Sequence, residues 1–192
     1  MFRSLRILLA LSPLIALPSG PARAMTVVER DFADLVERAE QIVVGRVSAI
    51  GAGKDPHGGP LTLVTFEDLT VLKGTVGSTL TLELSGGMLD SGRVMSIAEM
   101  PEFRVGERAV LFVRGNGTDL CPLVGVWQGR FRVVHDEALG VDVVERSDGA
   151  RISGLEGRKL RSARRDDPAA MTVEDFQSLI REEMAHPSEV SQ

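Results

Sequence analysis

Few residues of this chain have the chemistry for nucleophilic catalysis: one cysteine, Cys121, and three histidines, His57, His135 and His186. A thiol hydrolase needs its cysteine exposed, with a lowered pKa, and held against a base. Cys121 and His135 fall on neighbouring predicted strands, so the two can meet. However, Cys121 lies in the apolar run 120–124, where a free cysteine behaves as a small hydrophobe. The sequence predicts a buried, slow thiol, and a hydrolase that uses Cys121 or a carboxylate site is the alternative.

The sequence contains no pattern typical of a metal site or of a cofactor-binding site. The three histidines lie far apart in the chain, and no pair has the spacing of ligands on one helix face or hairpin. The run Gly-Ala-Gly-Lys at 51–54 lacks the spacing and the following helix of a phosphate-binding or dinucleotide-binding loop. We therefore expect no catalytic residue set, no metal and no cofactor.

Four residues are candidates for binding a partner: Trp127, Gln128, Lys73 and His57. Trp127 and Gln128 precede a glycine, and an exposed Trp on such a bulge often anchors an interface; the other interpretation is a core Trp. Lys73 ends a predicted strand with a positive charge, or simply forms a turn. His57 lies in the Gly- and Pro-rich loop 51–60, which is either a binding loop or an ordinary hairpin tip.

The N-terminus has the pattern of an export signal. Arg3 and Arg6 form a basic start, 7–17 is apolar, and Ala-Arg-Ala at 22–24 places small residues where a signal peptidase reads. The apolar stretch is too short for a permanent membrane span. We expect cleavage before Met25, an exported protein in the periplasm or outside the cell, and no stable membrane anchor; an uncleaved anchor is the alternative.

Composition narrows the class of partner. The 192 residues include 22 Lys and Arg and 27 Asp and Glu, a net charge of −5 with His neutral. Nucleic acids and anionic membrane surfaces attract basic proteins, so both are poor partners for this acidic chain. Tyrosine is absent and aromatic residues make up 4%, which is little for a stacking surface. A single cysteine excludes an intrachain disulfide.

Hydrophobic periodicity predicts a mainly β chain with a helix near each end. Apolar residues recur at helix spacing over 26–40, and a second helix follows Thr172, with Asp175 placed as in a capping box. The expected strands cover 41–50, 61–72, 79–84, 93–97, 107–114, 120–127, 130–135 and 140–146. Short strands joined by Gly-rich turns favour a barrel or a sandwich.

Two irregularities are expected within these strands. Gly45 predicts a bulge or the close approach of another backbone. The alternation over 61–72 breaks at Glu67 and Asp68, which predicts a bend. A long connection runs from the glycines at 86 and 87 to about residue 106, and Phe103 is expected to lie buried beneath it.

Five stretches carry a resemblance to known proteins. They are Ala39-Glu-Gln-Ile-Val-Val-Gly-Arg-Val47, Thr70-Val-Leu-Lys-Gly74, Ser85-Gly-Gly87, and the runs 101–113 and 125–133. In this order they resemble a group of poorly characterised bacterial exported proteins. The shape is similar to the OB-like barrel of the tissue inhibitors of metalloproteinases, and relatives of the group occur beside exported metalloproteases.

The resemblance implies a fold: a mainly β, OB-like antiparallel barrel, closed or partly open, with an N-terminal and a C-terminal helix. The expected division is a signal peptide over 1–24, a β-barrel domain with its helix over 25–146, a polar linker or surface loop over 147–170 and the last helix over 171–186. The tissue inhibitors chelate zinc through an N-terminal cysteine. The expected mature start at Met25 has none, so that mechanism is not implied here.

The leading functional hypothesis is an exported, non-catalytic binding module that recognises a protein or peptide, with an exported protease as one candidate. Its contacts would come from the loops 51–60 and 85–106. A binder predicts an exposed apolar patch among these loops and a slow thiol, whereas the hydrolase predicts a reactive Cys121. A structural envelope protein is the third hypothesis.

Overall fold

The computed structural model describes residues 29–89, 91–163 and 169–187, so the expected signal peptide over 1–24 lies outside the described residues. Two α-helices, α1 (Phe32–Arg38) and α2 (Val173–Ala185), and one 3-10 helix, η1 (Val126–Gly129), accompany ten antiparallel strands in this part of the chain. The strands are β1 (Gln41–Lys54), β2 (Pro60–Lys73), β3 (Leu80–Ser85), β4 (Gly87–Met88), β5 (Val94–Met95), β6 (Arg108–Val113), β7 (Arg130–Asp136), β8 (Val141–Glu145), β9 (Arg151–Glu156) and β10 (Lys159–Ala163). The predicted mainly β class with a helix near each end is confirmed. None of the described helices is long and apolar enough to cross a membrane.

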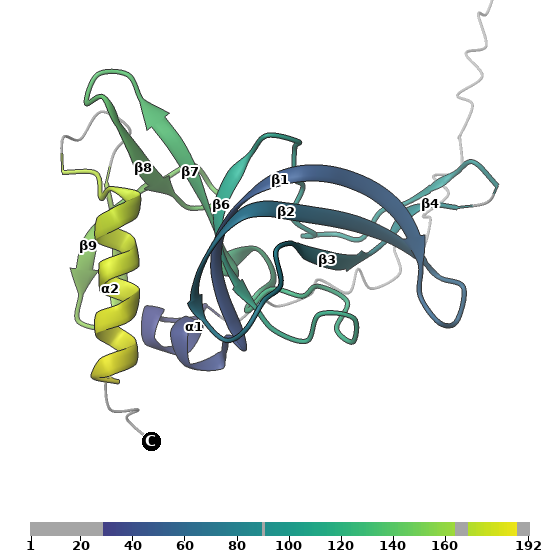
Figure 1. The fold of residues 1–192 in the computed structure, drawn as a ribbon, viewed down its shortest axis with the longest axis horizontal. Helices are drawn as coiled ribbons and strands as arrows, with labels where there is room; N and C mark the ends of the chain where they lie inside the picture. Colours follow the sequence, from purple (N-terminus) through teal and green to yellow (C-terminus); the bar gives the residue numbers. More distant parts are fainter. Residues whose placement is uncertain (1–28, 90, 164–168, 188–192) are drawn as a thin grey trace, which may run out of the picture.

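Eight of the strands form one sheet in the order β10-β9-β8-β7-β6-β1-β2-β3, and β4 pairs with β5 in a separate ribbon. The sheet is open, because β3 and β10 are its two edges and do not pair within the described residues. The long strands β1 and β2 arch away from the helices toward the β4–β5 ribbon (Figure 1). The molecule therefore has a helix-covered end and a curved end.

The arch of β1 and β2 starts at two irregularities that the sequence predicted. The β1–β2 register shifts between Val44 and Arg46, opposite Thr70 and Glu67, and Asp68 adopts a φ of 53°. A Cβ on Gly45 would lie 2.7 Å from Leu69 Cδ2, so the glycine permits the close approach of β2. A bulge increases the bend and twist of a strand pair, and here it turns the distal halves of both strands away from the helices.

Two hydrophobic clusters lie on opposite faces of the sheet, because β1 alternates between them: Ile42 and Val44 face one, Val43 and Val47 the other. The first, the helix-side cluster, joins both helices to β1 and β6–β9. Its fully buried large side chains include Phe32, Phe112, Phe176, Ile42, Ile152 and Ile180. The second, the concave cluster, lies inside the arch and includes Val43, Val47, Phe66, Leu82 and Leu111.

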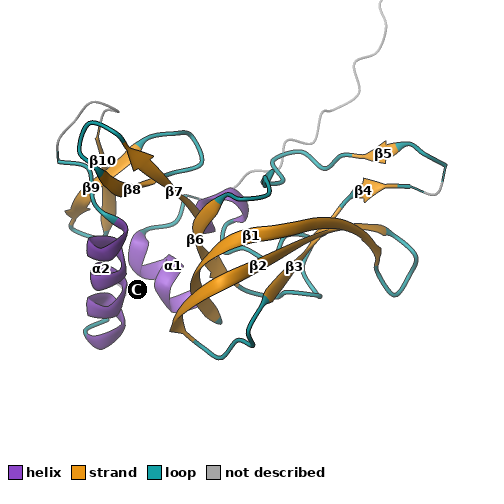
Figure 2. Ribbon diagram, turned by 45° about the horizontal axis from the view of Figure 1, so that its top comes forward, coloured by secondary structure: helices purple, strands orange, loops and turns teal. Residues whose placement is uncertain are grey.

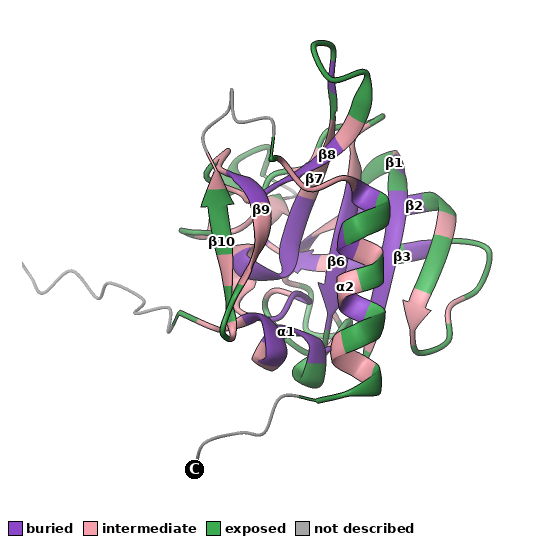
Figure 3. Ribbon diagram, turned by 90° about the vertical axis from the view of Figure 1, so that its left-hand side faces the viewer, coloured by how far each residue is buried: buried purple, intermediate pink, exposed green. Residues whose placement is uncertain are grey.

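Local signals fix both helices on the sheet. Asp31 caps α1 by accepting the Asp34 N–H at 2.8 Å, and Thr172 caps α2 by accepting the Asp175 N–H at 3.1 Å, as the capping pattern predicted. Just before α2, the Met171 N–H donates to the Ile152 carbonyl at 2.6 Å, and the Met171 carbonyl accepts from Val144 at 3.1 Å. The entry of α2 is thus tied to both β8 and β9, and Figure 3 shows the helix lying over the buried faces of the strands.

Three segments differ from the sequence prediction. The strand expected over 120–127 is wrong: Leu123 forms a single bridge to Val113, and η1 follows. Gly125 and Val126 have φ values of 63° and 60°, left-handed conformations that no strand continues through.

The polar linker or surface loop expected over 147–170 is also wrong for 151–163, where β9 and β10 form a hairpin. Its polar composition concealed the strands, because the hairpin lies at the sheet edge and packs few side chains, among them Ile152 and Leu160, on the helix-side cluster. The loop expected over 51–60 is shorter than predicted, since β1 continues to Lys54 and β2 begins at Pro60.

Candidate functional site

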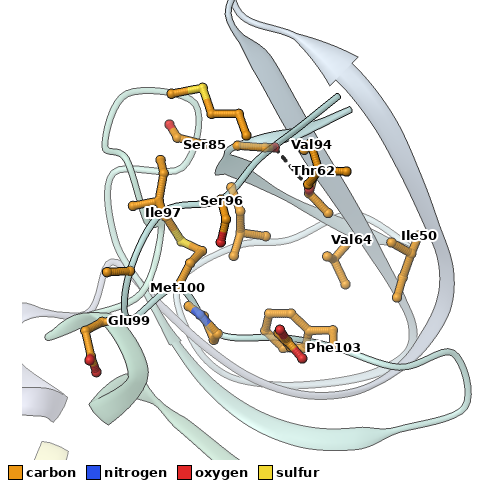
Figure 4. A pocket seen from close by; sticks show the side chains of 17 residues that line it. Ile50, Thr62, Val64, Ser85, Val94, Ser96, Ile97, Glu99, Met100 and Phe103 are labelled. Atoms are coloured by element: carbon orange, nitrogen blue, oxygen red, sulfur yellow. Dashed lines mark hydrogen bonds between the residues drawn. The ribbon is translucent and has the colours of Figure 1, made fainter. Parts of the chain in front are cut away.

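An open cleft of about 490 Å³ is lined by residues of β1–β5 and of the connection up to Phe103. Figure 2 shows these strands at the curved end of the molecule, away from α1 and α2. One wall comes from β1 and β2, which contribute Ile50 and Val64. The facing wall comes from residues 94–103. In Figure 4, Ile97 and Met100 face Val64 and Ile50 across the cleft, and Phe103 lies at its lower end. The lining is thus mixed: apolar side chains, hydroxyls, backbone groups and the two carboxylates of Glu99 and Glu102.

The β4–β5 ribbon that borders the cleft is held close to β2 by two glycines. Gly86 donates its N–H to the Pro60 carbonyl at 2.9 Å, and its own carbonyl accepts from Thr62 Oγ1 at 3.0 Å. A Cβ on Gly86, at a φ of 100°, would lie 2.8 Å from the Met95 carbonyl oxygen, and one on Gly87 would lie 2.9 Å from Thr62 Oγ1. Only glycine fits this approach without strain.

The rim of the cleft exposes large apolar side chains. Val94 is 67% exposed, Met88 56% and Met95 45%, and all three lie on the β4–β5 ribbon. Ile50 on β1 is also exposed. Exposed large apolar side chains beside a cleft are typical of a protein-interaction site. The arrangement can accept an apolar side chain and cover it with the ribbon.

The end of the cleft is supported by ring and charge contacts. Phe103 packs edge-on against Phe66, with the ring centroids 5.6 Å apart, and the Arg130 guanidinium lies 4.6 Å from the Phe103 ring centroid. Arg130 is itself bound to the Glu107 carboxylate, its Nε donating at 3.1 Å. The expected burial of Phe103 beneath the 86–106 connection is confirmed in part, since the ring is half-buried.

Trp127 and Gln128, the first two binding candidates, lie together in η1. Gln128 is buried, and its Oε1 accepts the Arg30 N–H at 2.8 Å, which ties the segment before α1 to the sheet. Trp127 is half-buried, lines a small hollow of about 70 Å³, and accepts the Ser147 hydroxyl on its carbonyl at 2.9 Å. Both residues therefore have contacts within the fold, and neither lines the cleft.

Lys73 and His57 are separate from that pair. Lys73 Nζ donates to the Val36 and Glu37 carbonyls at 2.7 and 3.0 Å, so it satisfies the last turn of α1. Burial lowers the pKa of Lys73. His57 is exposed at the β1–β2 turn, which Asp55 closes by accepting the backbone N–H of His57 at 2.7 Å. The structure does not unite the four candidates in one site.

Cys121 does not have the environment of a nucleophile. The thiol packs beside the concave cluster, and desolvation raises its pKa to about 11. In the described part of the chain no hydrogen bond joins it to His135, whose Nδ1 lies 3.0 Å from Asp142 Oδ1. A thiolate is therefore disfavoured at neutral pH.

The cleft residues Val94, Met95 and Met100 were not singled out from the sequence, although the connection that carries them was named as a contact loop. The available signal was local: large apolar side chains inside a Gly-rich connection that has no expected core position.

Among the residues that the structure describes, no group of three or more His, Cys, Asp and Glu side chains is placed to hold a metal ion. No family model, curated protein or solved structure matches this chain.

Proposed function

We propose that this protein is a non-catalytic binding module that recognises a protein or peptide segment through the cleft. The observation that carries the proposal is the cleft together with the exposed side chains of Val94 and Met95 in its lining and of Met88 beside them on the β4–β5 ribbon. In this proposal the protein is exported to the periplasm or beyond. An exported protease is the partner class that the sequence resemblance suggests.

Two properties expected of a binder are present. An exposed apolar patch lies in the 85–106 connection, and burial raises the pKa of the Cys121 thiol instead of lowering it. Neither property is expected of a hydrolase that uses this thiol. The single observation that distinguishes the two hypotheses most directly is the thiol environment, because nucleophilic chemistry needs the thiolate.

The proposal includes an OB-like, partly open barrel as the fold type. Strands β1, β2, β3 and β6 curve around the concave cluster. Residues 115–124 then run along the unpaired side of β3, where the Leu120 carbonyl accepts the Ser85 N–H at 2.9 Å. A covering loop at that edge is consistent with a barrel that is partly open, with the cleft at one end.

The test is selection of a peptide library against the purified chain, followed by affinity measurements. We expect enrichment of peptides that carry a large apolar residue. Val94→Ser combined with Met95→Ser should weaken a selected peptide about thirtyfold, because each change removes apolar contact area worth roughly 1 kcal/mol.

Val71→Ser is the matched control, since Val71 is 41% exposed on β2 but does not line the cleft. Its affinity should equal that of the wild type. Failure to enrich any peptide, or an equal loss in Val71→Ser, would contradict the proposal.

A further inference from the structure

A second hollow, of about 420 Å³, is lined in part by Arg104, the residue that follows Phe103 of the cleft. We call it the arginine hollow, because four arginines and a histidine line it: Arg46, Arg104, Arg108, Arg132 and His135. Phe103 lines the cleft, and the next residue, Arg104, lines the arginine hollow. A partner that covers this short segment therefore reaches both hollows.

The carboxylates near the hollow leave guanidinium donors unused. Arg108 binds Asp142 at 3.0 Å, but Arg46 lies 3.7 Å from Asp68, and Arg132 lies 3.8 Å from Glu145. These two distances are too long for good hydrogen bonds. Arg104 is exposed and has no ion pair with any residue that the structure describes. The hollow thus has more cationic donors than the fold satisfies.

The sheet register also places two of these cations directly against each other. Arg46 on β1 is the cross-strand partner of Arg108 on β6. Like charges directly opposite each other destabilise an antiparallel pair. Asp142 offsets this for Arg108, whereas Arg46 donates to the Gly106 carbonyl at 3.3 Å and lies 3.7 Å from Asp68. An anion between the two guanidinium groups would remove the repulsion.

We propose that the arginine hollow binds side-chain carboxylates of an acidic segment in the partner protein. The proposal rests on the proposed function and adds the chemical character of the segment: acidic residues next to the apolar residue that enters the cleft. Guanidinium groups suit this role because their planar donors match carboxylate geometry.

A peptide fits this site better than an extended polyanion. The chain carries a net charge of −5, while the lining of the hollow has four arginines against the two carboxylates Glu107 and Asp142. The positive region is therefore local. A nucleic acid or an anionic membrane would extend beyond the hollow over a chain of net negative charge, whereas a few carboxylates of a peptide would not.

The first test measures the affinity of the full chain for a fluorescein-labelled hexaglutamate peptide at low salt and at 150 mM NaCl. We expect saturable binding that weakens with salt. Arg104→Gln should weaken it about threefold to fivefold, the range of one exposed ion pair. The Arg46→Gln/Arg104→Gln double variant should weaken it about tenfold or more. Arg181→Gln on α2, which makes the same charge change elsewhere, should have no effect.

Thermal unfolding separates this proposal from a purely structural role. If Arg46 serves only to pair with Asp68, Arg46→Gln should lower Tm. If Arg46 instead lies opposite Arg108 to bind an anionic ligand, Arg46→Gln should leave Tm unchanged or raise it, and the affinity for the peptide should fall. No peptide binding at low salt, a loss in Arg181→Gln equal to that in Arg104→Gln, or a lowered Tm in Arg46→Gln each overturns the proposal.

Two further probes test the ligand class: a single-stranded DNA oligonucleotide, and vesicles of phosphatidylglycerol. Tighter binding of either through the same arginines also overturns it. If only the hexaglutamate peptide fails to bind, the selection of peptides with a large apolar residue is unaffected, and so is the proposed function.

Discussion

The helix-covered end and the curved end of this molecule use the same sheet in different ways. At the first, α1 and α2 cover the strands, and phenylalanine rings from both layers pack together in the helix-side cluster. The centroid of the Phe176 ring lies 4.9 Å from that of Phe131 and 5.8 Å from that of Phe32. At the second, β1–β3 curve around a smaller cluster, and neither α1 nor α2 lines the cleft. One end holds the fold, and the other leaves apolar surface available for contact.

Phe176→Ala should give the largest effect, because it removes a fully buried ring from the centre of the helix-side cluster. We expect a loss of about 3–5 kcal/mol in the free energy of unfolding. Phe103→Ala, which removes a half-buried ring at the cleft, should cost less than half of that. Urea unfolding with equal m values checks both. Equal losses would mean that the curved end contributes as much to stability as the helix-covered end.

The thiol of Cys121 reports on how well the concave cluster is closed. Because burial raises its pKa to about 11 from a reference value of 9.0, its thiolate fraction at pH 8 is about a hundredfold below that of an unperturbed thiol. Alkylation by iodoacetamide should be about a hundredfold slower than for glutathione. Rapid alkylation under native conditions would favour the hydrolase hypothesis.

Gly86→Ala tests the placement of the β4–β5 ribbon. A methyl group would meet the Met95 carbonyl at a φ that L residues rarely adopt, and strain of this kind costs about 1–3 kcal/mol. Gly51→Ala is the control, because Gly51 has open space around it and an ordinary φ; it should be neutral or slightly stabilising. The Gly86 variant should also weaken peptide binding, whereas the control should not.

Asp31→Asn should give a small, pH-dependent effect at the helix-covered end. The side-chain hydrogen bond from Arg158 is the main cause that lowers the pKa of Asp31 below 3.8, and Arg158 Nε donates to Asp31 Oδ2 at 2.8 Å. A carboxyl with a lowered folded pKa stabilises the fold above its unfolded pKa, and this contribution is lost as the pH falls through the folded pKa.

Asn caps a helix about as well as Asp, so Asp31→Asn removes mainly the charge interaction. We expect a loss of at most about 1 kcal/mol at pH 7 that disappears as the pH drops below 3.8. Urea unfolding at pH 7 and at a pH below 3.8 measures this loss in the free energy of unfolding. Glu174→Gln, which changes an exposed carboxyl at the start of α2, is the control. A loss that persists at low pH would point to a defect in the cap.

Much of this fold could be predicted where local chemistry decides the structure. Alternation gave β2 and β3 nearly to their ends, Thr172 marked the start of α2, and the break at Glu67 and Asp68 located the bend. The predictions that failed concern segments whose structure depends on contacts with distant parts of the chain. The left-handed turn at Gly125 and Val126 ends an otherwise strand-like run.

The candidate site was harder to predict because its residues meet only after folding. Lys73 and Gln128 carry polar groups that suggest contacts, but their partners, the end of α1 and the Arg30 N–H, come from elsewhere in the chain. Likewise, Arg46 and Arg104 are far apart in sequence and become neighbours only through the pairing of β1 with the segment before β6, where Gly106 donates to the Val47 carbonyl at 2.8 Å. No linear motif signals such a cluster.

Residues 115–124, which run along the edge of β3, include an asparagine that can change chemically as the protein ages. The side chain of Asn116 imitates a peptide group: its Nδ2 donates to the Thr81 carbonyl at 2.7 Å, and its Oδ1 accepts the Glu83 N–H at 3.0 Å, which blocks that sheet edge against another strand. Asn116 precedes Gly117, a dipeptide prone to spontaneous deamidation. Conversion to Asp would replace the donor with a carboxylate oxygen facing the Thr81 carbonyl. Aged protein would then expose the edge of β3 and become prone to edge-to-edge aggregation.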